Sequence, residues 1–298
     1  MSETLLLGVP KGSLEAPTLN LFARAGFSFQ GSGRSLWLSS SDAEIAPVLL
    51  KPQEIPRFVA SGSLDCGITG FDWICETNVD EDIRVLADLP YSKRSRKPVQ
   101  WVLAVSKDSD FQSLDDFKST RTRPVRVSTE LKHIVDEWLA ERGIIAEVAF
   151  SWGATEAKVP VFADAIVECT ETGESLEANN LRVLDVVLES SPKFFANRLL
   201  YRSDTWKRAK IDGISILLES CLAADTRVTV HVVVPSHDVE NVKALLPSSA
   251  QYSVINSEAN EVLFDIVLNK DALPHLIPQL ARNGVTQVTV QNPVLLYR

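Results

Sequence analysis

The fold class is decided by one stretch, residues 162–179, which is Phe162-Ala163-Asp164-Ala165-Ile166-Val167-Glu168-Cys169-Thr170-Glu171-Thr172-Gly173-Glu174-Ser175-Leu176-Glu177-Ala178-Asn179. Its apolar first half predicts a buried strand, and its second half predicts a helix that begins at Glu174 after a glycine turn. A strand, a turn and a helix in this order are typical of an α/β protein. Backbone amides at the helix start, with the hydroxyls of Thr170, Thr172 and Ser175, form a cradle for a phosphate group. An ordinary capped turn explains the same residues equally well.

Strands and helices alternate on both sides of this stretch, through about the first 200 residues. Apolar runs of strand length occur at residues 5–9, 45–50, 64–70, 85–89, 99–105, 125–127, 144–149, 163–169, 181–188 and 194–201. The alternation predicts mainly parallel strands in two lobes, with a boundary at the basic, turn-rich run Lys93 to Lys97. We expect the strands after residue 181 to return to the first lobe and a helix to follow at about residues 204–223.

The C-terminal part has a different order of predicted strands and helices. Strands are predicted at residues 227–234, 251–256, 262–269 and 286–290, and helices at residues 238–246 and 272–282. This βαββαβ order is the ferredoxin-like α+β unit.

Composition excludes several function classes. The chain has 298 residues, 45% of them hydrophobic, and a formal net charge of −9. An acidic chain is a poor non-specific ligand for nucleic acid, which needs many cations on one face. No apolar run approaches the roughly 18 residues of a membrane-spanning helix, and the N-terminus lacks a secretory signal, so we expect a cytoplasmic protein. The four cysteines and four histidines have no metal-ligand spacing, so no protein-held metal is expected.

Two further segments are candidates for ligand binding. Lys11 and Gly12 follow the first predicted strand, and ligands of open α/β sheets bind beyond the carboxyl ends of strands. Lys11 is therefore suited to a phosphate or pyrophosphate, although a solvated surface lysine is the simpler explanation. Asp72 follows the Gly67-Ile68-Thr69-Gly70 strand end and is suited either to capping a helix or to contacting a base or ribose. Asp164 and Glu168 are carboxylates that suit ribose hydroxyls.

These segments occur in the order that is typical of one enzyme family. The matching pieces are Pro10-Lys11-Gly12-Ser13-Leu14, Lys51-Pro52-Gln53-Glu54-Ile55-Pro56, Asp65-Cys66-Gly67-Ile68-Thr69-Gly70, Arg126-Val127-Ser128-Thr129-Glu130 and residues 163–179. Together they resemble ATP phosphoribosyltransferase, the first enzyme of histidine biosynthesis. The resemblance implies a two-lobed catalytic core like the type II periplasmic binding proteins, with lobe I at residues 1–92 and 185–212 and lobe II at residues 93–184. It also implies that residues 213–298 form the ACT-like regulatory domain of the family's long form.

The resemblance implies a glycosyltransferase reaction in which N1 of the ATP adenine attacks C1 of phosphoribosyl pyrophosphate and pyrophosphate leaves. Positive charge then develops on the ribose, so positioning and charge neutralisation should outweigh a protein nucleophile. By the same resemblance, the donor site comprises Lys11, Gly12, Glu156, Asp164, Glu168, Thr170, Glu171, Thr172, Gly173, Glu174 and Ser175. Lys11 and Asp164 are the expected catalytic residues, and Asp72, Ser128 and Thr129 are expected on the ATP side. Mg²⁺ is expected on substrate oxygens.

Three positions depart from the family pattern. Ser13 and Gln100 stand where many members have arginine, and Leu131 stands where many have tyrosine. We hypothesise that Arg94, Arg96 and Lys97 supply the missing positive charge. The departures also fit an alternative, a non-catalytic cytoplasmic protein that keeps a two-lobed ligand-binding cleft. A nucleobase-salvage phosphoribosyltransferase is disfavoured, because those enzymes usually have two adjacent acids where this chain has Glu168 and Cys169.

The family resemblance also implies partners. Histidine is the expected feedback inhibitor, and dimers that associate into hexamers are the expected assembly. The late glycine and proline signature of the family's C-terminal domain is missing, so inhibition by histidine is less firmly implied than the activity.

Overall fold

A computed structural model describes residues 3–31, 34–91, 98–119, 123–256, 260–285 and 287–297. The chain divides into two units, residues 1–215 and residues 216–298, and each is described by itself. The division lies three residues after the predicted start of the C-terminal domain. In the described part of the chain, no helix combines the length and the apolar character that a bilayer crossing requires.

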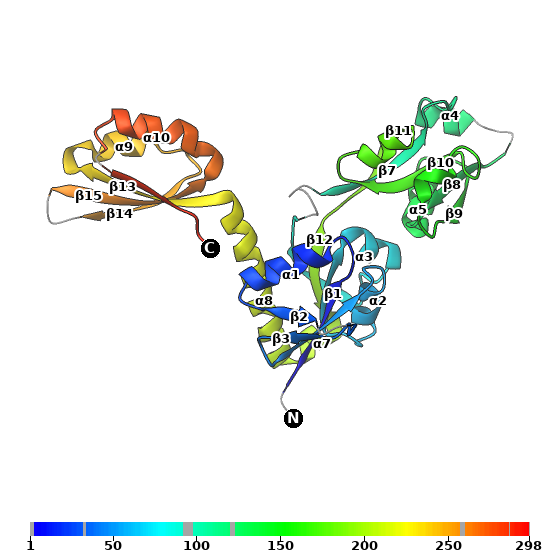
Figure 1. The fold of residues 1–298 in the computed structure, drawn as a ribbon, viewed down its shortest axis with the longest axis horizontal. Coiled ribbons are helices and arrows are strands. Elements are labelled where there is room, and N and C mark those ends of the chain that lie inside the picture. Colours follow the sequence, from blue (N-terminus) through cyan, green and yellow to red (C-terminus); the bar gives the residue numbers. More distant parts are fainter. Residues whose placement is uncertain are drawn as a thin grey trace. The chain divides into compact units, whose positions relative to one another are not determined.

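Lobe I is built on a sheet with the strand order β4-β1-β5-β12-β6 (Figure 1). Its strands are β1 (Leu5–Pro10), β4 (Ile45–Leu50), β5 (Cys66–Gly70), β6 (Ile83–Asp88) and β12 (Pro192–Asn197). Its helices are α1 (Glu15–Arg24), α2 (Ile55–Ala60), α3 (Phe71–Thr77) and α7 (Arg198–Ser203), and a small hairpin joins β2 (Phe29–Gly31) to β3 (Leu38–Ser40). Strand β1 is parallel to β4 and β5, as predicted, whereas β12 is antiparallel to both of its neighbours.

Lobe II has the strand order β11-β7-β10-β8-β9. Its strands are β7 (Val99–Ser106), β8 (Val125–Thr129), β9 (Ala146–Phe150), β10 (Ala165–Thr170) and β11 (Leu181–Ser190). Its helices are α4 (Leu114–Ser119), α5 (Lys132–Glu141), α6 (Glu174–Ala178) and the 3₁₀ helix η1 (Thr155–Lys158). Leu103, Val127 and Val167 are fully buried in its core, which explains the apolar residues at the centres of β7, β8 and β10.

The chain passes between the lobes twice, and the second passage differs from the prediction. Strand β11 pairs with β7 of lobe II as far as Ser190, and β12 returns to lobe I at Pro192. The boundary predicted at residue 184 therefore falls inside β11, because this strand continues past two irregularities in its pairing with β7. The first predicted boundary, at residue 92, lies outside the described residues.

The predicted strand at residues 194–201 ends early. Asn197 closes β12, and its side-chain oxygen accepts the N–H of Leu200 at 2.8 Å. An asparagine that caps a helix in this way stops the strand, so residues 198–203 form α7. Helix α8 (Thr205–Thr226) follows.

The C-terminal unit has the predicted ferredoxin-like order. Strands β13 (Arg227–Pro235), β14 (Gln251–Asn256), β15 (Glu261–Asn269) and β16 (Gln287–Gln291) form an antiparallel sheet in the order β14-β15-β13-β16. Helices α9 (Val239–Leu245) and α10 (Leu273–Arg282) lie on one face of this sheet, as Figure 1 shows. The 3₁₀ helices η2 (Ser236–Asp238) and η3 (Lys270–Ala272) precede them. Alternate side chains of β13 and β15 are buried under the helices, which is the period-two pattern of a sheet with one covered face.

Candidate active site

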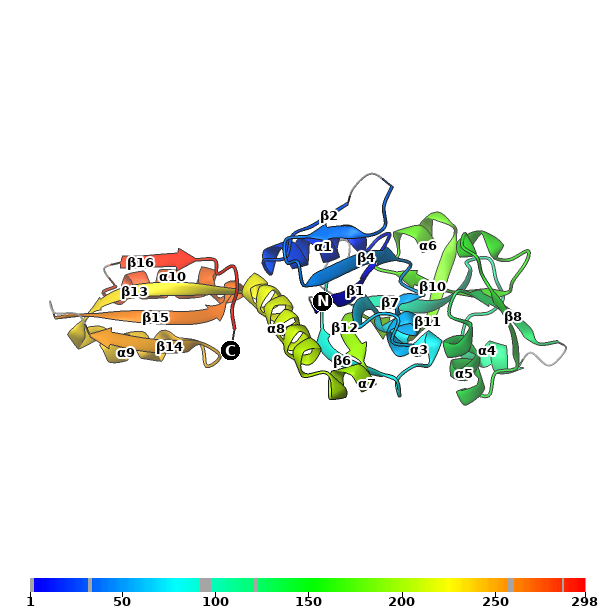
Figure 2. The ribbon, with the colours of Figure 1, turned by 90° about the horizontal axis from the view of Figure 1, so that it is seen from below.

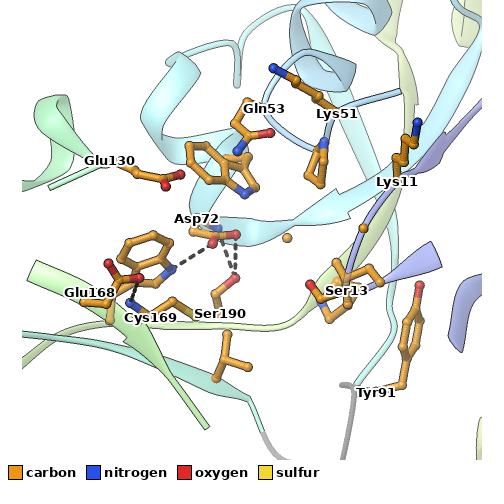
Figure 3. A pocket seen from close by; sticks show the side chains of 18 residues that line it. Lys11, Ser13, Lys51, Gln53, Asp72, Tyr91, Glu130, Glu168, Cys169 and Ser190 are labelled. Atoms are coloured by element: carbon orange, nitrogen blue, oxygen red, sulfur yellow. Dashed lines mark hydrogen bonds between the residues drawn. The ribbon is translucent and has the colours of Figure 1, made fainter. Parts of the chain in front are cut away.

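A cleft of about 620 Å³ receives residues from both lobes (Figure 3). Its lining residues are Lys11, Gly12, Ser13, Leu14, Lys51, Pro52, Gln53, Gly70, Asp72, Trp73, Tyr91, Val99, Trp101, Glu130, Glu168, Cys169, Ser190 and Pro192. Many of them follow the carboxyl ends of parallel strands or lie on the two passages between the lobes, which is where α/β proteins bind ligands. Four of the ligand-binding residues predicted from the sequence line this cleft: Lys11, Gly12, Asp72 and Glu168.

Two lysines lie side by side on the lobe I wall of the cleft. Pro10 of β1 and Leu50 of β4 are register partners, so the residues that follow them, Lys11 and Lys51, are neighbours at the same sheet edge. The N–H of Lys11 also donates to the carbonyl of Leu50 at 2.7 Å. Lys11 was predicted to bind a ligand and Lys51 was not, although both residues follow the carboxyl ends of parallel strands. Two ammonium groups on one wall suit a polyphosphate.

The floor of the cleft is a hydrogen-bonded group centred on Asp72. The Asp72 carboxylate accepts the indole N–H of Trp101 at 2.7 Å and the hydroxyl of Ser190 at 2.9 Å. Burial raises the pKa of Asp72, although these hydrogen bonds favour its ionised form. Because both oxygens are already bonded, Asp72 shapes the floor and joins α3 to the two passages between the lobes. Its predicted contact with ATP stays a prediction.

The wall contributed by lobe II carries two carboxylates, Glu130 and Glu168 (Figure 3). Glu168 is half-buried near the end of β10, and one of its oxygens accepts the N–H of Cys169 at 3.0 Å. Burial raises the pKa of Glu168, and a hydrogen bond with Thr155 partly opposes this effect. Figure 3 shows both carboxylates across the cleft from the two lysines, so the cleft has a cationic wall and an anionic wall.

The predicted phosphate turn follows the cleft-lining residues Glu168 and Cys169 directly. The hydroxyl of Thr170 accepts the N–H of Gly173 at 2.9 Å, and Gly173 has the left-handed φ of 80°. The hydroxyl of Ser175 donates to Glu156 at 2.5 Å, which brings together two residues predicted for one site. Helix α6 has only five residues, so its dipole is small, and the groups that the turn offers to an anion are its own amides and hydroxyls.

Asp164 does not line the cleft, and its predicted catalytic role stays a prediction. Its carboxylate, which is 9% exposed, binds Arg123 at 2.5 Å and Arg126 at 2.9 Å. Burial disfavours its charge, but the hydrogen bonds from the two arginines outweigh burial and hold the pKa of Asp164 well below its ordinary range. Asp164 precedes β10, whereas Glu168 and Cys169 reach the cleft from the other end of that strand, and Asp164 is not one of the residues that line the cleft.

Ser128 and Thr129 also do not line this cleft. Thr129 is fully buried, and its hydroxyl accepts the N–H of Leu131 at 3.0 Å. The Ser128 hydroxyl accepts from Lys158 at 3.3 Å and lines a separate hollow of lobe II. Both residues lie at the end of β8, and their predicted contacts with ATP stay predictions.

The three departures from the family pattern have different structural settings. Ser13 lines the cleft. The side-chain amide of Gln100 donates to Glu189 at 3.0 Å, and Leu131 is fully buried. Arg94, Arg96 and Lys97 lie outside the described residues, between the lining residues Tyr91 and Val99, so their predicted compensating role stays a prediction.

A second pocket, of about 520 Å³, adjoins the first. The two pockets share Lys51, Gln53, Trp73 and Glu130. The remaining lining residues of the second pocket are Glu54, Arg57, Phe58, Glu76, Thr77, Phe150, Ser151 and Trp152. Its wall is thus rich in aromatic side chains, and Trp152 is 93% exposed against Phe150 at a ring separation of 4.8 Å. An aromatic wall beside cations is suited to a nucleotide.

The fold and the cleft define a two-lobed α/β enzyme core for phosphorylated ligands, followed by a ferredoxin-like domain. The family model for HisG, ATP phosphoribosyltransferase, matches residues 51–220. The chain belongs to this family.

Relatives of similar length support the assignment. The ATP phosphoribosyltransferase of Chlorobium phaeobacteroides is 41% identical over 293 residues, which cover 98% of this chain and 97% of the relative. The enzyme of Thermodesulfovibrio yellowstonii is 40% identical over 286 residues, covering 95% of each chain. Among solved structures, the ATP phosphoribosyl transferase (HisG:HisZ) complex of Thermotoga maritima has a TM-score of 0.60 at 21% identity and covers 72% of this chain and 99% of its own, which shows the shared fold.

The predicted family, fold class and activity are therefore confirmed. The enzyme transfers a phosphoribosyl group from phosphoribosyl pyrophosphate to ATP, the first step of histidine biosynthesis. The alternative of a non-catalytic binding protein is set aside.

Proposed function

We propose that phosphoribosyl pyrophosphate lies across the first cleft, with its 5-phosphate in the turn of residues 170–175 and its pyrophosphate against Lys11, Gly12 and Lys51. Two observations carry this proposal: the turn directly follows the cleft-lining residues Glu168 and Cys169, and two lysines line the cleft on the lobe I side. Phosphate groups bind backbone amides, hydroxyls and ammonium groups of this kind. The ribose then lies between the two ends, next to Glu168.

Charge development explains why this order suits the reaction. As the bond from C1 to pyrophosphate breaks, positive charge grows on the ribose and negative charge grows on the leaving group. The Glu168 carboxylate faces the first charge, and Lys11 and Lys51 face the second. Preorganised groups that match developing charge lower the barrier without a covalent intermediate.

ATP is proposed to occupy the second pocket and to present its adenine across the shared wall at Trp73. The aromatic side chains of Trp73, Phe150 and Trp152 offer faces for adenine, and Arg57 and Lys51 offer cations for the triphosphate. Because the pockets share a wall, N1 of the adenine would meet C1 of the ribose near Glu130 and Trp73.

Magnesium fits this cleft as a substrate-borne ion. Glu130 is the kind of oxygen donor that Mg²⁺ accepts, and one carboxylate with substrate phosphates and waters forms a typical Mg²⁺ donor set. Bound there, the ion would neutralise charge on the phosphate oxygens.

Regulation and assembly follow the family resemblance. Histidine is proposed as the inhibitor acting through the C-terminal domain, and a homo-oligomer in the cytoplasm is the proposed form of the enzyme. Binding to nucleic acid is not expected for a chain with a net charge of −9.

Lys11→Ala and Thr172→Val test the position of the donor substrate. We expect each variant to raise the KM for phosphoribosyl pyrophosphate about tenfold, the equivalent of one charge-assisted hydrogen bond, with a smaller effect on the KM for ATP. Initial rates are measured from the ultraviolet change of N1-substituted adenine, with each substrate varied in turn.

Lys118→Ala is the matched control, because Lys118 is an exposed lysine on α4 whose ammonium group binds Asp115. The proposal fails if the KM for phosphoribosyl pyrophosphate is the same in the two test variants as in this control.

A further inference from the structure

Helix α5 of lobe II begins without a cap of its own. Its N-cap residue is Leu131, whose side chain makes no capping hydrogen bond and is fully buried. A helix of ten residues leaves its first amides without intrahelical partners, and these amides require an acceptor from elsewhere.

The acceptor comes from the other lobe. One oxygen of Glu76, on α3 of lobe I, accepts the N–H of His133 at 3.0 Å. The other oxygen accepts the N–H of Ile134 at 3.1 Å. The carboxylate thus binds two successive amides at the start of α5 from a position 57 residues earlier in the chain. Helices α3 and α5 lie next to each other in Figures 1 and 2, in agreement with these bonds.

Glu76 is the second acid on the same face of α3. Asp72, one turn earlier, reaches Trp101 of lobe II, as described above. Residues four apart on a helix share a face, so α3 presents two carboxylates to lobe II, one at the floor of the cleft and one at the rim of the second pocket. Both bonds hold only when the lobes have one relative arrangement.

We propose that Glu76 is a positioning residue, whose bond to the start of α5 holds the two lobes in the arrangement in which both pockets meet. Without this bond, the lobes open, and a substrate must bind the smaller fraction of molecules that are closed. The apparent dissociation constant of each substrate then equals its intrinsic value divided by the closed fraction. The saturated enzyme, held closed by its substrates, turns over at its ordinary rate. The proposal rests on the proposed location of the substrates in the two pockets.

Glu76→Ala and Glu76→Gln in the full-length enzyme test this role. We expect Glu76→Ala to raise the KM for both substrates roughly three- to thirtyfold, the range of a lost helix cap, with kcat changed less than about threefold. Glu76→Gln keeps one acceptor oxygen and should lie between Glu76→Ala and the wild type. Loss of folded enzyme would instead lower kcat and leave KM unchanged.

Hydrogen exchange of the substrate-free protein gives a readout that does not depend on activity. The amides of His133 and Ile134 should exchange at least about fivefold faster in Glu76→Ala, whereas the amides of β8 should be unchanged. Glu141→Ala, which removes an exposed carboxylate from the other end of α5, is the matched control and should leave exchange and KM at wild-type values.

The outcomes separate the two proposals. Unchanged exchange at His133 and Ile134, or a loss confined to kcat, overturns the role of Glu76. Faster exchange with unchanged KM values also overturns it, since opening would then not limit binding. Failure of the Lys11→Ala and Thr172→Val test would instead leave the exchange result standing and reject only the placement of the donor substrate.

Discussion

The two ends of β10 carry acidic side chains in opposite situations. Asp164, before the strand, is held by Arg123 and Arg126, and these bonds keep its pKa low. Glu168, four residues later, faces the cleft, and burial raises its pKa. Four residues of strand span roughly 13 Å, so one ribose cannot contact both carboxylates.

The difference separates a residue that holds the fold from one that is available to a ligand. A carboxylate whose lone pairs are filled by two guanidinium groups has nothing left to offer a substrate. A carboxylate that is half-buried beside a cleft retains free acceptor capacity and gains most from an incoming positive charge. Motif position alone does not distinguish the two.

The largest expected effect is a difference in activity between variants at the two ends of β10. Glu168→Gln should lower kcat/KM about 100-fold, equivalent to roughly 2.7 kcal/mol of lost transition-state stabilisation, because a neutral amide does not match the charge on the ribose. Asp164→Asn, the same change at the other end of the strand, should stay within about threefold of the wild type. Steady-state kinetics of the two variants check this, and equal losses would refute the contrast.

The second-largest expected effect is a difference in stability between variants at the two ends of β10. Asp164→Asn should lower the free energy of unfolding by about 2 kcal/mol at pH 7, because it leaves two arginines without their partner. The pKa of Asp164 is lower in the folded protein than its value of roughly 3.9 in the unfolded chain. Its ion pairs therefore stabilise the folded protein above roughly pH 3.9, and this stabilisation is lost as the pH falls toward the folded-state pKa.

Urea unfolding at pH 7 and at pH values below about 4 measures this difference. The difference in the free energy of unfolding between the wild type and Asp164→Asn should become smaller at acid pH. Glu168→Gln should not lower the free energy of unfolding at pH 7. A gap that is constant with pH would contradict the ion-pair explanation.

The smallest expected effect concerns the backbone conformation of Gly173, in the turn that follows β10. Gly173 has a φ of 80°, and an added Cβ would meet nothing within 4 Å. Gly173→Ala should therefore cost only the backbone strain of a left-handed alanine, about 1 kcal/mol, and should raise the KM for phosphoribosyl pyrophosphate by less than about fivefold.

Gly213→Ala is its control. Gly213 lies in α8 with open space around its Cα and without a positive φ, so alanine there should stabilise the protein by roughly 0.5–1 kcal/mol. If both glycine variants shift the melting temperature in the same direction, the φ of Gly173 does not govern the turn.

Local sequence patterns predicted most of the fold. Strand β4 was predicted at its observed residues, 45–50, because every residue of that run is apolar and the run is bounded by polar residues. The strand predicted at residues 194–201 was too long, because nothing in the apolar run announces that Asn197 caps a helix. Strand pairing depends on partners that are distant in the chain. The chain's return to lobe I was therefore predicted at residue 185, whereas it occurs between Ser190 and Pro192.

The candidate site was predictable where it follows strand ends. Lys11, Glu168 and the turn were found by this argument, and the same argument applied to β4 would have found Lys51. Ser128, Thr129 and Asp164 do not line the first cleft, because a motif gives the positions of residues along the chain but not the partners that fill their hydrogen-bonding capacity. Glu76 carries no motif at all, and only the packing of α3 against α5 reveals it.

The position of β12 has a consequence for how the chain is made. This strand inserts between β5 and β6, so lobe I lacks the central connection of its sheet until residue 197 has left the ribosome. Residues 99–190, which supply the strands of lobe II, emerge before that point. Lobe I therefore cannot complete its sheet before the last strand of lobe II has been made, and until then β5 and β6 each have an edge without its partner strand.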